Sequence, residues 1–170
     1  MKTIIILAMH GSPPKDFPPR ELGEFFGLHA RMESAPRSMD DASRERYAEL
    51  DRKMRSWKRT AENDPFYAGS LALVNNLAET SELETRLAFN EFCDPPLESA
   101  IRQAVADGAK RIVVVTPMMT AGGEHAEVEI PAELERLKAE LSGVDLVYAW
   151  PFNPRDVALF LNAHVQRFLG

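Results

Sequence analysis

The sequence predicts an α/β domain built on a four-stranded parallel sheet in the order 2-1-3-4, with helices on both faces. Two runs, TIIILAM at 3–9 and RIVVVTPM at 111–118, are continuously apolar and β-branched. Such runs are typical of strands that are covered on both sides. Segments with helical spacing alternate with the strands over short links, and this alternation indicates parallel strands joined by right-handed crossovers.

Two weaker strands complete the sheet, at 84–92 (ETRLAFNEF) and 145–152 (DLVYAWPF), each bounded by polar residues or proline. The helices between strands are marked by prolines at their starts and glycines after their ends. They are expected at 67–79, from Pro95-Pro96 to a cap at Gly108, from Pro131 to Gly143, and from Asn153-Pro154 onward.

The chain of 170 residues is long enough for one domain, which we place at 1–170. Residues 13–64 interrupt the alternation and read as a Pro-rich and helical insertion after the first strand. Tyr47, Leu50, Met54, Trp57 and Ala61 form a narrow apolar seam that is typical of helix-on-helix contact. The segment is expected to be a lid or a dimer arm, and a helix packed on its own domain is an equal alternative.

The composition excludes several classes of protein. A net charge of −6 argues against a general nucleic-acid binder. A single cysteine, Cys93, excludes a disulfide framework and fits a reducing, cytoplasmic location. The first apolar run is only about seven residues long and ends in His-Gly-Ser, which favours a buried strand over a signal peptide. No segment approaches the roughly 18 apolar residues that span a bilayer. No membrane partner is therefore expected.

Potential metal ligands stand at or just beyond the ends of three predicted strands. His10 follows the first strand, Glu91 ends the second, and His125 lies in the turn after the third. Ligands of open parallel sheets bind beyond the carboxyl ends of the strands, so these side chains can converge. Two imidazoles and one carboxylate suit Fe²⁺, Co²⁺ or Ni²⁺ with open coordination positions.

Each residue also has an alternative without function. His10 is followed by Gly-Ser and can be a polar turn residue, and Glu91 alone can be a surface carboxylate. The acidic residues around His125 are expected to be a solvated first turn, which the helix dipole favours; they are Glu124, Glu127, Glu129 and Glu133. His29 and His164 do not follow a strand, so the case rests on convergence of the three.

The segments LAMHGS, LAFNEFCDPPLESAI and GAKRIVVVTPMMTAGGEHAEVEIP, in this order, resemble the short CbiX type of sirohydrochlorin cobaltochelatase, in the class II chelatase family. The resemblance covers the first strand and then about residue 66 to the C-terminus, and it skips 13–64. Two positions depart from the family pattern. Glu129 stands where an Asp is usual before Ile-Pro, and MMTA replaces an aromatic or leucine-rich run before the glycines.

The resemblance implies insertion of a divalent metal, Co²⁺ or possibly Fe²⁺ or Ni²⁺, into sirohydrochlorin or a related tetrapyrrole. His10, His125 and Glu91 would be the catalytic residues and the metal ligands. Imidazole can take the ring N–H protons at cellular pH and can hold the incoming ion. The metal would be a substrate, with no permanently bound cofactor. A short chain of this family is expected to form a homodimer.

Further residues are candidates for holding the macrocycle. Met118 and Met119, with Met9, could form a soft wall against its face or belong to the core. Its carboxylates need local cations, for which the arginines and lysines of 13–64 are available. The expected substrate-binding residues are Ser12, Lys15, Arg20, Met118, Met119, Gly122 and Gly123.

Two alternatives belong to other functional classes. A non-catalytic tetrapyrrole- or metal-binding carrier of the same fold would use the same ligands without turnover. A histidine phosphatase also has His-Gly after its first strand, but its signature places an arginine before that histidine. Here the position is Met9, so the phosphate clamp is missing.

Overall fold

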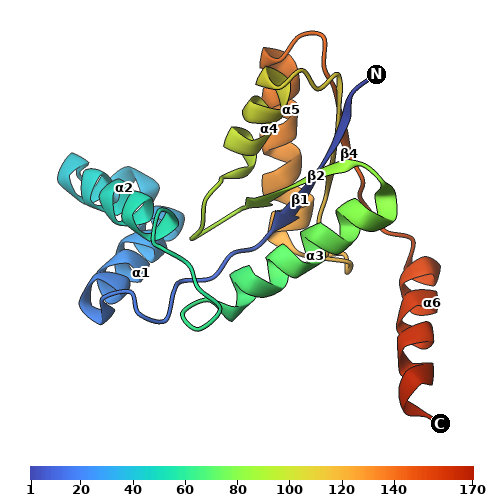
Figure 1. Ribbon diagram of the computed structural model, residues 1–170. Helices are drawn as coiled ribbons and strands as arrows, with labels where there is room; N and C mark the ends of the chain where they lie inside the picture. Colours follow the sequence, from blue (N-terminus) through green and yellow to red (C-terminus); the bar gives the residue numbers. More distant parts are fainter.

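The four strands form one parallel sheet in the order β2-β1-β3-β4, as the sequence predicts. The structure is a computed structural model that describes residues 1–170, apart from the side chains at positions 33 and 36. The strands are β1 (Thr3–Met9), β2 (Glu84–Phe89), β3 (Arg111–Val115) and β4 (Asp145–Tyr148). Figure 1 shows the sheet nearly edge-on. β1 lies between β2 and β3, so the end of this strand is inside the carboxyl edge of the sheet.

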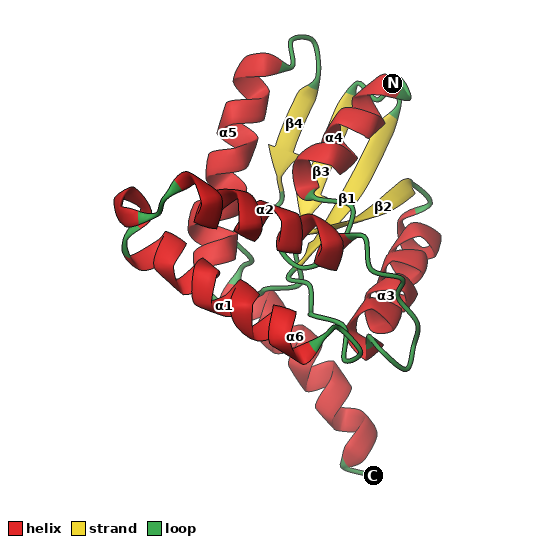
Figure 2. Cartoon of the chain, turned by 90° about the vertical axis from the view of Figure 1, so that its left-hand side faces the viewer, coloured by secondary structure: helices red, strands yellow, loops and turns green.

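Helices cover both faces of the sheet (Figure 2). α4 (Leu97–Ala106) and α5 (Ile130–Glu140) pack on one face, where Ile4, Ile6 and Ile112 join a fully buried cluster. α3 (Pro65–Ser81) packs on the other face, against Leu7 and Phe89. The alternating sides of β1 therefore supply two separate cores, which explains why its sequence is apolar without interruption.

Side-chain caps mark the starts of two helices, and α3 extends two residues beyond each end of the predicted 67–79. Asp64 accepts a hydrogen bond from the Tyr67 N–H at the start of α3, and Asn153 accepts one from the Arg155 N–H at the start of α6 (Pro154–Val165). Gly108 has φ +89° just after α4, a conformation that favours glycine.

Three strands end earlier than the sequence predicts. β2 stops at Phe89, three residues before the expected end, and Phe92 in the following bends has φ +59°. β3 stops before Pro117, and β4 stops before Pro151. Proline has no N–H to offer a sheet ladder, so the apolar residues around these prolines belong to loops.

The insertion contains two long helices, α1 (Pro19–Ser34) and α2 (Asp41–Arg55), with a short 3₁₀ turn η1 (Pro36–Ser38) between them. The sequence pattern did not clearly predict α1. Leu50 and Met54 of the predicted seam are fully buried in the chain, against Phe25 of α1 and Phe92 of the loop after β2. The seam is thus a helix-on-helix contact.

The seam is nevertheless shorter than expected. α2 ends at Arg55, so Trp57 lies beyond the helix, and its indole N–H donates to Asp16. Figure 1 shows α1 and α2 side by side next to the carboxyl edge of the sheet. A role of 13–64 as a lid or a dimer arm stays a prediction.

The last helix lies apart from the rest. α6 and the 3₁₀ turn η3 (Gln166–Phe168) project from the end of β4, away from the sheet (Figure 1). None of the described residues of α6 or η3 is buried. Among the helices of the described chain, none is long and apolar enough to cross a membrane.

We expect Met54→Ala to lower the free energy of unfolding by about 2–5 kcal/mol, because it opens a cavity in the cluster that joins the insertion to the loop after β2. Denaturant unfolding followed by circular dichroism measures the change. Lys58→Ala, at an exposed position just beyond α2, is the control and should change stability by less than about 0.5 kcal/mol. Equal small effects would mean that the insertion is not packed on the domain.

Candidate functional site

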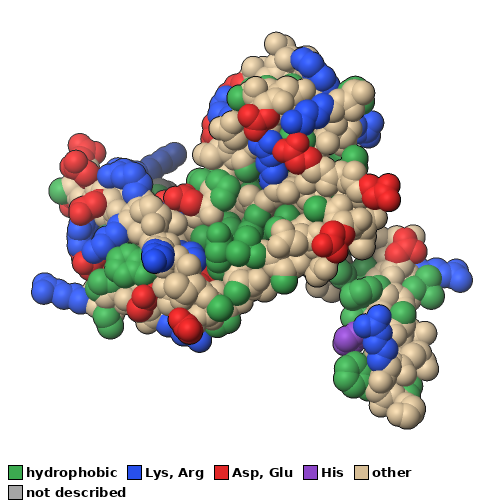
Figure 3. All heavy atoms as spheres, viewed as in Figure 1, with side chains coloured by type: hydrophobic (Ala, Val, Ile, Leu, Met, Phe, Trp, Pro, Cys, Tyr) green, Lys and Arg blue, Asp and Glu red, His purple; other side chains and the backbone are tan. Residues whose placement is uncertain are grey.

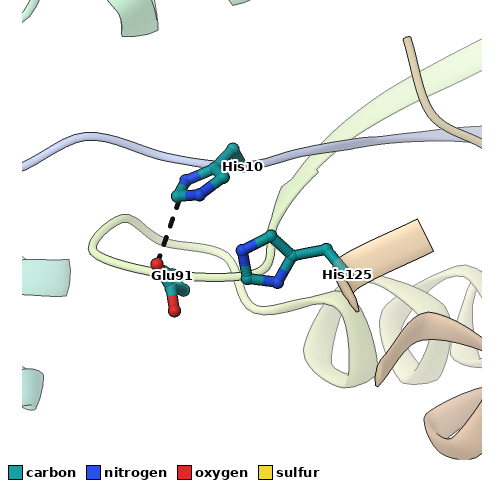
Figure 4. A group of neighbouring side chains, drawn as sticks. All are labelled: His10, Glu91 and His125. Carbon is teal, nitrogen blue, oxygen red and sulfur yellow. Dashed lines mark ion pairs between the residues drawn. The ribbon is translucent and has the colours of Figure 1, made fainter. Parts of the chain in front are cut away.

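His10, Glu91 and His125 converge at the carboxyl edge of the sheet, as Figure 4 shows. Each offers one ligand atom, and these three atoms lie within 4.8 Å of one another. Among the described residues this is the one group of three or more such side chains. The convergence predicted from the strand order is therefore present in the fold.

His10 is half-exposed and contacts both partners. Its Nδ1 lies 3.9 Å from Oε2 of Glu91, and its ring meets the ring of His125 edge-on at 4.5 Å between centroids. The same Nδ1 lies 3.1 Å from the carbonyl oxygen of Gly11, which can only accept a hydrogen bond. This contact favours the tautomer with a proton on Nδ1 and a free lone pair on Nε2.

The loops after β1 and β2 hold His10 and Glu91 at a fixed spacing. The N–H of Glu91 donates to the His10 carbonyl at 2.9 Å, and Asn90 N–H donates to the Met9 carbonyl at 2.9 Å. Gly11 has φ +105°, and a Cβ at this position would lie 1.9 Å from the carbonyl oxygen of Glu91. Only glycine therefore allows the two loops to approach this closely.

His125 begins η2 (His125–Glu129), a single π-helical turn that leads into α5. Pro131 has no N–H, so the Glu127 carbonyl lacks its usual helical donor. The N–H of Ile130 donates to the His125 carbonyl, five residues back rather than the usual four. Such turns are frequent at functional sites, where they redirect one side chain.

Glu129 orients the His125 ring. Its Oε2 lies 2.5 Å from Nδ1 of His125, and a carboxylate only accepts, so Nδ1 carries the proton of the neutral ring. The Nε2 lone pair is then left for another partner. Carboxylates commonly support ligating histidines in this way.

The site is negative and accessible. Exposed side-chain fractions are 45% for His10, 23% for Glu91 and 18% for His125. Two carboxylates, Glu91 and Glu129, flank two imidazoles, and the nearby Glu127 accepts from the Gly122 N–H at 2.9 Å. This arrangement attracts a cation and leaves one side of it open to a second molecule.

β4 also supports the turn that carries His125. The hydroxyl of Tyr148 donates to the Ala126 carbonyl at 2.9 Å, and burial raises the pKa of Tyr148 to about 12. The hydroxyl thus keeps its proton, and its hydrogen bond, across the neutral range.

Two arginines of the insertion form hydrogen bonds with the loops after β1 and β2, which carry His10 and Glu91. Arg59 donates to the Ser12 carbonyl at 2.7 Å and to the Phe92 carbonyl, so one guanidinium bridges the loops after β1 and β2. It also forms an ion pair of 2.7 Å with Asp64, and the two side chains are 4% and 1% exposed. A buried charge of this kind requires its partner.

Arg55 adds two hydrogen bonds to the loop after β2. It donates to the carbonyl of Asn90 at 3.0 Å and to that of Cys93 at 3.1 Å, and its Nε pairs with Asp51 at 2.9 Å. Burial raises the pKa of the Cys93 thiol to about 11, so the sole cysteine is neutral beside these arginines. Both arginines were candidates for binding substrate carboxylates, and the fold uses them internally.

The other predicted substrate-binding residues differ in their burial and in their surroundings. Met118 is partly buried against the core of the α4–α5 face, so its contact with the macrocycle stays a prediction, whereas Met9 is buried in the core beneath α3. Met119 lines an apolar groove beside α6. Gly122 has φ +94°, and it is exposed with Gly123 in the turn before His125.

Ser12 and the two predicted cations lie in the segment that follows His10. The Ser12 hydroxyl is 3.4 Å from the Pro13 carbonyl, and its own carbonyl is held by Arg59. Within the described part of the chain, neither Lys15 nor Arg20 forms a hydrogen bond or ion pair with the three converging side chains. Their role in binding stays a prediction.

Sequence reasoning did not identify Glu129 and Arg59 as supporting residues. Glu129 was assigned to a solvated helix turn, but its spacing of four from His125, just before Pro131, is a usable signal. Arg59 carries no such signal, because the carbonyls it bridges are about 47 and 33 positions away in the chain.

A family model matches most of the region that follows the insertion. The family model described as CbiX matches residues 63–167, more than half of the chain. The chain belongs to the CbiX family. Glu91 and His125 lie inside the matched region, whereas His10 and most of the insertion precede it.

Two relatives and one solved structure are similar to this CbiX-family chain. It is 31% identical over 84 residues to the chloroplastic sirohydrochlorin ferrochelatase of Arabidopsis thaliana, covering 49% of this chain and 37% of the relative. It is 32% identical over 82 residues to the sirohydrochlorin cobaltochelatase of Sulfurisphaera tokodaii, covering 48% of this chain and 64% of the relative. The CbiX protein of cobalamin biosynthesis from Marinobacter aquaeolei VT8 aligns with a TM-score of 0.47 and 25% identity, over 98% of this chain and 97% of that one.

We expect Gly11→Ala to disrupt the candidate site, because the new Cβ would overlap the Glu91 carbonyl and the positive φ would be strained. The unfolding free energy should fall by at least about 2 kcal/mol, the scale of such strain. Gly27→Ala in α1 is the control, since among the described residues nothing beyond its chain neighbours and its own helix backbone lies within 4 Å of its Cβ position, and it should be neutral or stabilising. Equal stabilities of the two variants would contradict the close approach.

We also expect Arg59→Met to lower the unfolding free energy by about 3–5 kcal/mol, because it leaves Asp64 buried without its cation. Chemical denaturation measures this change. Arg52→Met in α2, at an exposed position, is the matched control and should stay within about 0.5 kcal/mol of wild type. If Arg59→Met behaved like the control, the brace between the loops would not exist.

Proposed function

We propose that this CbiX-family chain inserts a divalent metal ion into a tetrapyrrole, with sirohydrochlorin as the first candidate. The main support for this proposal is that His10, Glu91 and His125 lie close together at an accessible carboxyl edge of the sheet. Two matched relatives are named as sirohydrochlorin chelatases, one for iron and one for cobalt. The chain spans 37% and 64% of their lengths, so their activity is carried over as a proposal.

The proposed reaction exchanges two protons for one ion. The free macrocycle carries two inner N–H groups, which lose their protons as the metal bonds to the ring nitrogens. The Nε2 lone pairs of His10 and His125 are the proposed bases, since each Nδ1 has an acceptor beside it. Glu91 offsets the charge of the ion and can pass protons to solvent.

The spacing of the three donor atoms favours weak binding of the metal ion, which must pass on to the macrocycle. A metal at about 2.1 Å from each donor keeps any two donors within about 4.2 Å. Here the three atoms are separated by up to 4.8 Å, so the side chains must close by up to about 0.6 Å to share an ion. Reorganisation on binding lowers affinity, which favours transfer to a macrocycle with four nitrogens.

The donor set accommodates Co²⁺ and Fe²⁺ alike, and we propose both as metal substrates rather than resident cofactors. Lys15 and Arg20 remain the proposed contacts for the acid groups of the macrocycle. We further propose that the chain works as a homodimer in the cytoplasm, as the resemblance and the single cysteine predict. The family match argues against the histidine phosphatase alternative.

Single-turnover insertion into sirohydrochlorin, followed by absorbance with Co²⁺ and with Fe²⁺, tests the proposal. His10→Ala and His125→Ala should each slow insertion by about 10²–10⁴-fold, the usual contribution of a positioned base. Glu91→Gln, which keeps the side-chain volume, should also slow it. His164→Ala in the projecting α6 is the matched histidine control and should retain the wild-type rate.

Two results would contradict this function. A wild-type chain that binds the macrocycle or the metal without producing the metallated spectrum would be the non-catalytic carrier. Histidine variants with the wild-type rate would remove His10 and His125 from the reaction.

A further inference from the structure

Phe26 of α1 is an exposed aromatic side chain close to the three converging side chains. It is 44% exposed. Its ring meets the ring of Phe92 edge-on, with 6.0 Å between the centroids. The ring of Phe92 in turn stacks on that of His10, with 6.2 Å between the centroids and an interplanar angle of 25°. Two successive ring contacts therefore connect Phe26 of the insertion to a proposed metal ligand.

Exposure alone does not distinguish Phe26 from other apolar residues of the surface. Scattered apolar side chains are normal on soluble proteins, and Figure 3 shows them in several places, including the projecting α6. Phe26 differs in its surroundings. Among the exposed large apolar side chains of the described residues, it is the one that belongs to the series of ring contacts with His10.

The backbone of Phe92 is strained. Its φ of +59° lies in the left-handed region that favours glycine, and a residue keeps such a conformation only where its surroundings determine it. The residue is 8% exposed and packs with Phe25 of α1 and Leu50 of α2. The insertion thus holds the Phe92 ring between His10 and Phe26. Strain of this kind is concentrated at functional sites.

The surface of α1 beside Phe26 is open. Gly23 and Ala30 lie three and four residues from Phe26, so they share its side of the helix, and both are exposed. Among the described residues, nothing beyond chain neighbours and the backbone of the helix lies within 4 Å of a Cβ built at Gly23. A planar molecule can therefore approach this side of the helix closely.

We propose that Phe26 and this side of α1 form one wall of the macrocycle site, with the Phe26 ring in contact with the tetrapyrrole. The inference rests on the proposed function and identifies a substrate-binding residue in the insertion. A tetrapyrrole is several times wider than an imidazole, so a macrocycle placed over His10 and His125 extends to the neighbouring side chains. Aromatic side chains pair favourably with other π systems, face-to-edge or offset.

Two exposed arginines of α1 suit the acid groups of such a molecule. Arg20 and Arg31 are eleven residues apart, which is close to three helical turns, so both extend from one side of the helix. Around the helix, Gly23 and Gly27 separate this side from Phe26. The apolar part of the macrocycle can then contact Phe26 while a carboxylate of its rim reaches an arginine.

Binding of metal-free sirohydrochlorin, followed by absorbance titration, tests this wall. Phe26→Ala should weaken binding by about tenfold, which corresponds to roughly 1.4 kcal/mol of lost apolar contact. Phe26→Trp keeps an aromatic ring and should bind within threefold of wild type. Leu83→Ala is the control, since Leu83 is 40% exposed and precedes β2 at the opposite edge of the sheet. It should change the dissociation constant by less than twofold.

Two further measurements separate a direct contact from an effect transmitted through Phe92. Co²⁺ binding without macrocycle, followed by absorbance, should agree within twofold between wild type and Phe26→Ala, because Phe26 is not one of the donors. Raising the salt from about 0.05 to 0.5 M should reduce the effect of Arg31→Gln on sirohydrochlorin binding and leave that of Phe26→Ala unchanged. Salt screens exposed charges but not apolar contacts.

Equal dissociation constants for sirohydrochlorin in wild type and Phe26→Ala would overturn the wall. A loss of Co²⁺ binding as large as the loss of macrocycle binding would also overturn it, because Phe26 would then act through the ligands. The chelatase activity has its own readout, the metallated spectrum. A chain that binds sirohydrochlorin through Phe26 without inserting metal would refute the activity alone, and normal insertion with unchanged binding in Phe26→Ala would refute the wall alone.

Discussion

The contact between the loops that follow β1 and β2 is the constraint on which the site depends. The Glu91 carbonyl lies where a side chain at position 11 would begin, and backbone hydrogen bonds join the two loops on either side of this point. Since β1 and β2 are adjacent parallel strands, the sheet delivers both loops to the same edge. Gly11 then lets them close, which brings His10 to within reach of Glu91.

The insertion reinforces that contact from outside. Its hydrophobic cluster takes in Phe92, and the Arg59 guanidinium bridges carbonyls of both loops. Loops without secondary structure of their own are usually the mobile parts of an α/β domain. Here they are held by a packed pair of helices and by a buried ion pair, Arg59–Asp64. The Arg59 guanidinium of the insertion thus contributes to the geometry of the site before any substrate is considered.

The two histidines are supported unequally. His125 is held by Glu129 and by a turn that Tyr148 anchors, whereas His10 is more exposed and has the Gly11 carbonyl and Glu91 beside its Nδ1. The hydrogen bond to Glu129 sets the orientation of the His125 ring, and the more accessible His10 ring is the one that can move if the three donors close around an ion.

The sequence by itself indicated the sheet, because the β-branched runs that begin at 3 and 111 are typical of strands covered on both faces, although the second strand ends at Val115. Parallel order then placed His10, Glu91 and His125 at one edge, so the convergence could be predicted from strand ends alone. Only the tertiary structure decided that Arg55 and Arg59 brace loops instead of facing solvent, and that Glu129 faces His125. It also decided that α6 leaves the sheet, since an apolar stripe specifies that a helix needs a partner surface and does not specify which surface. Local patterns encode periodicity and caps, whereas contacts between distant segments depend on how the whole chain packs.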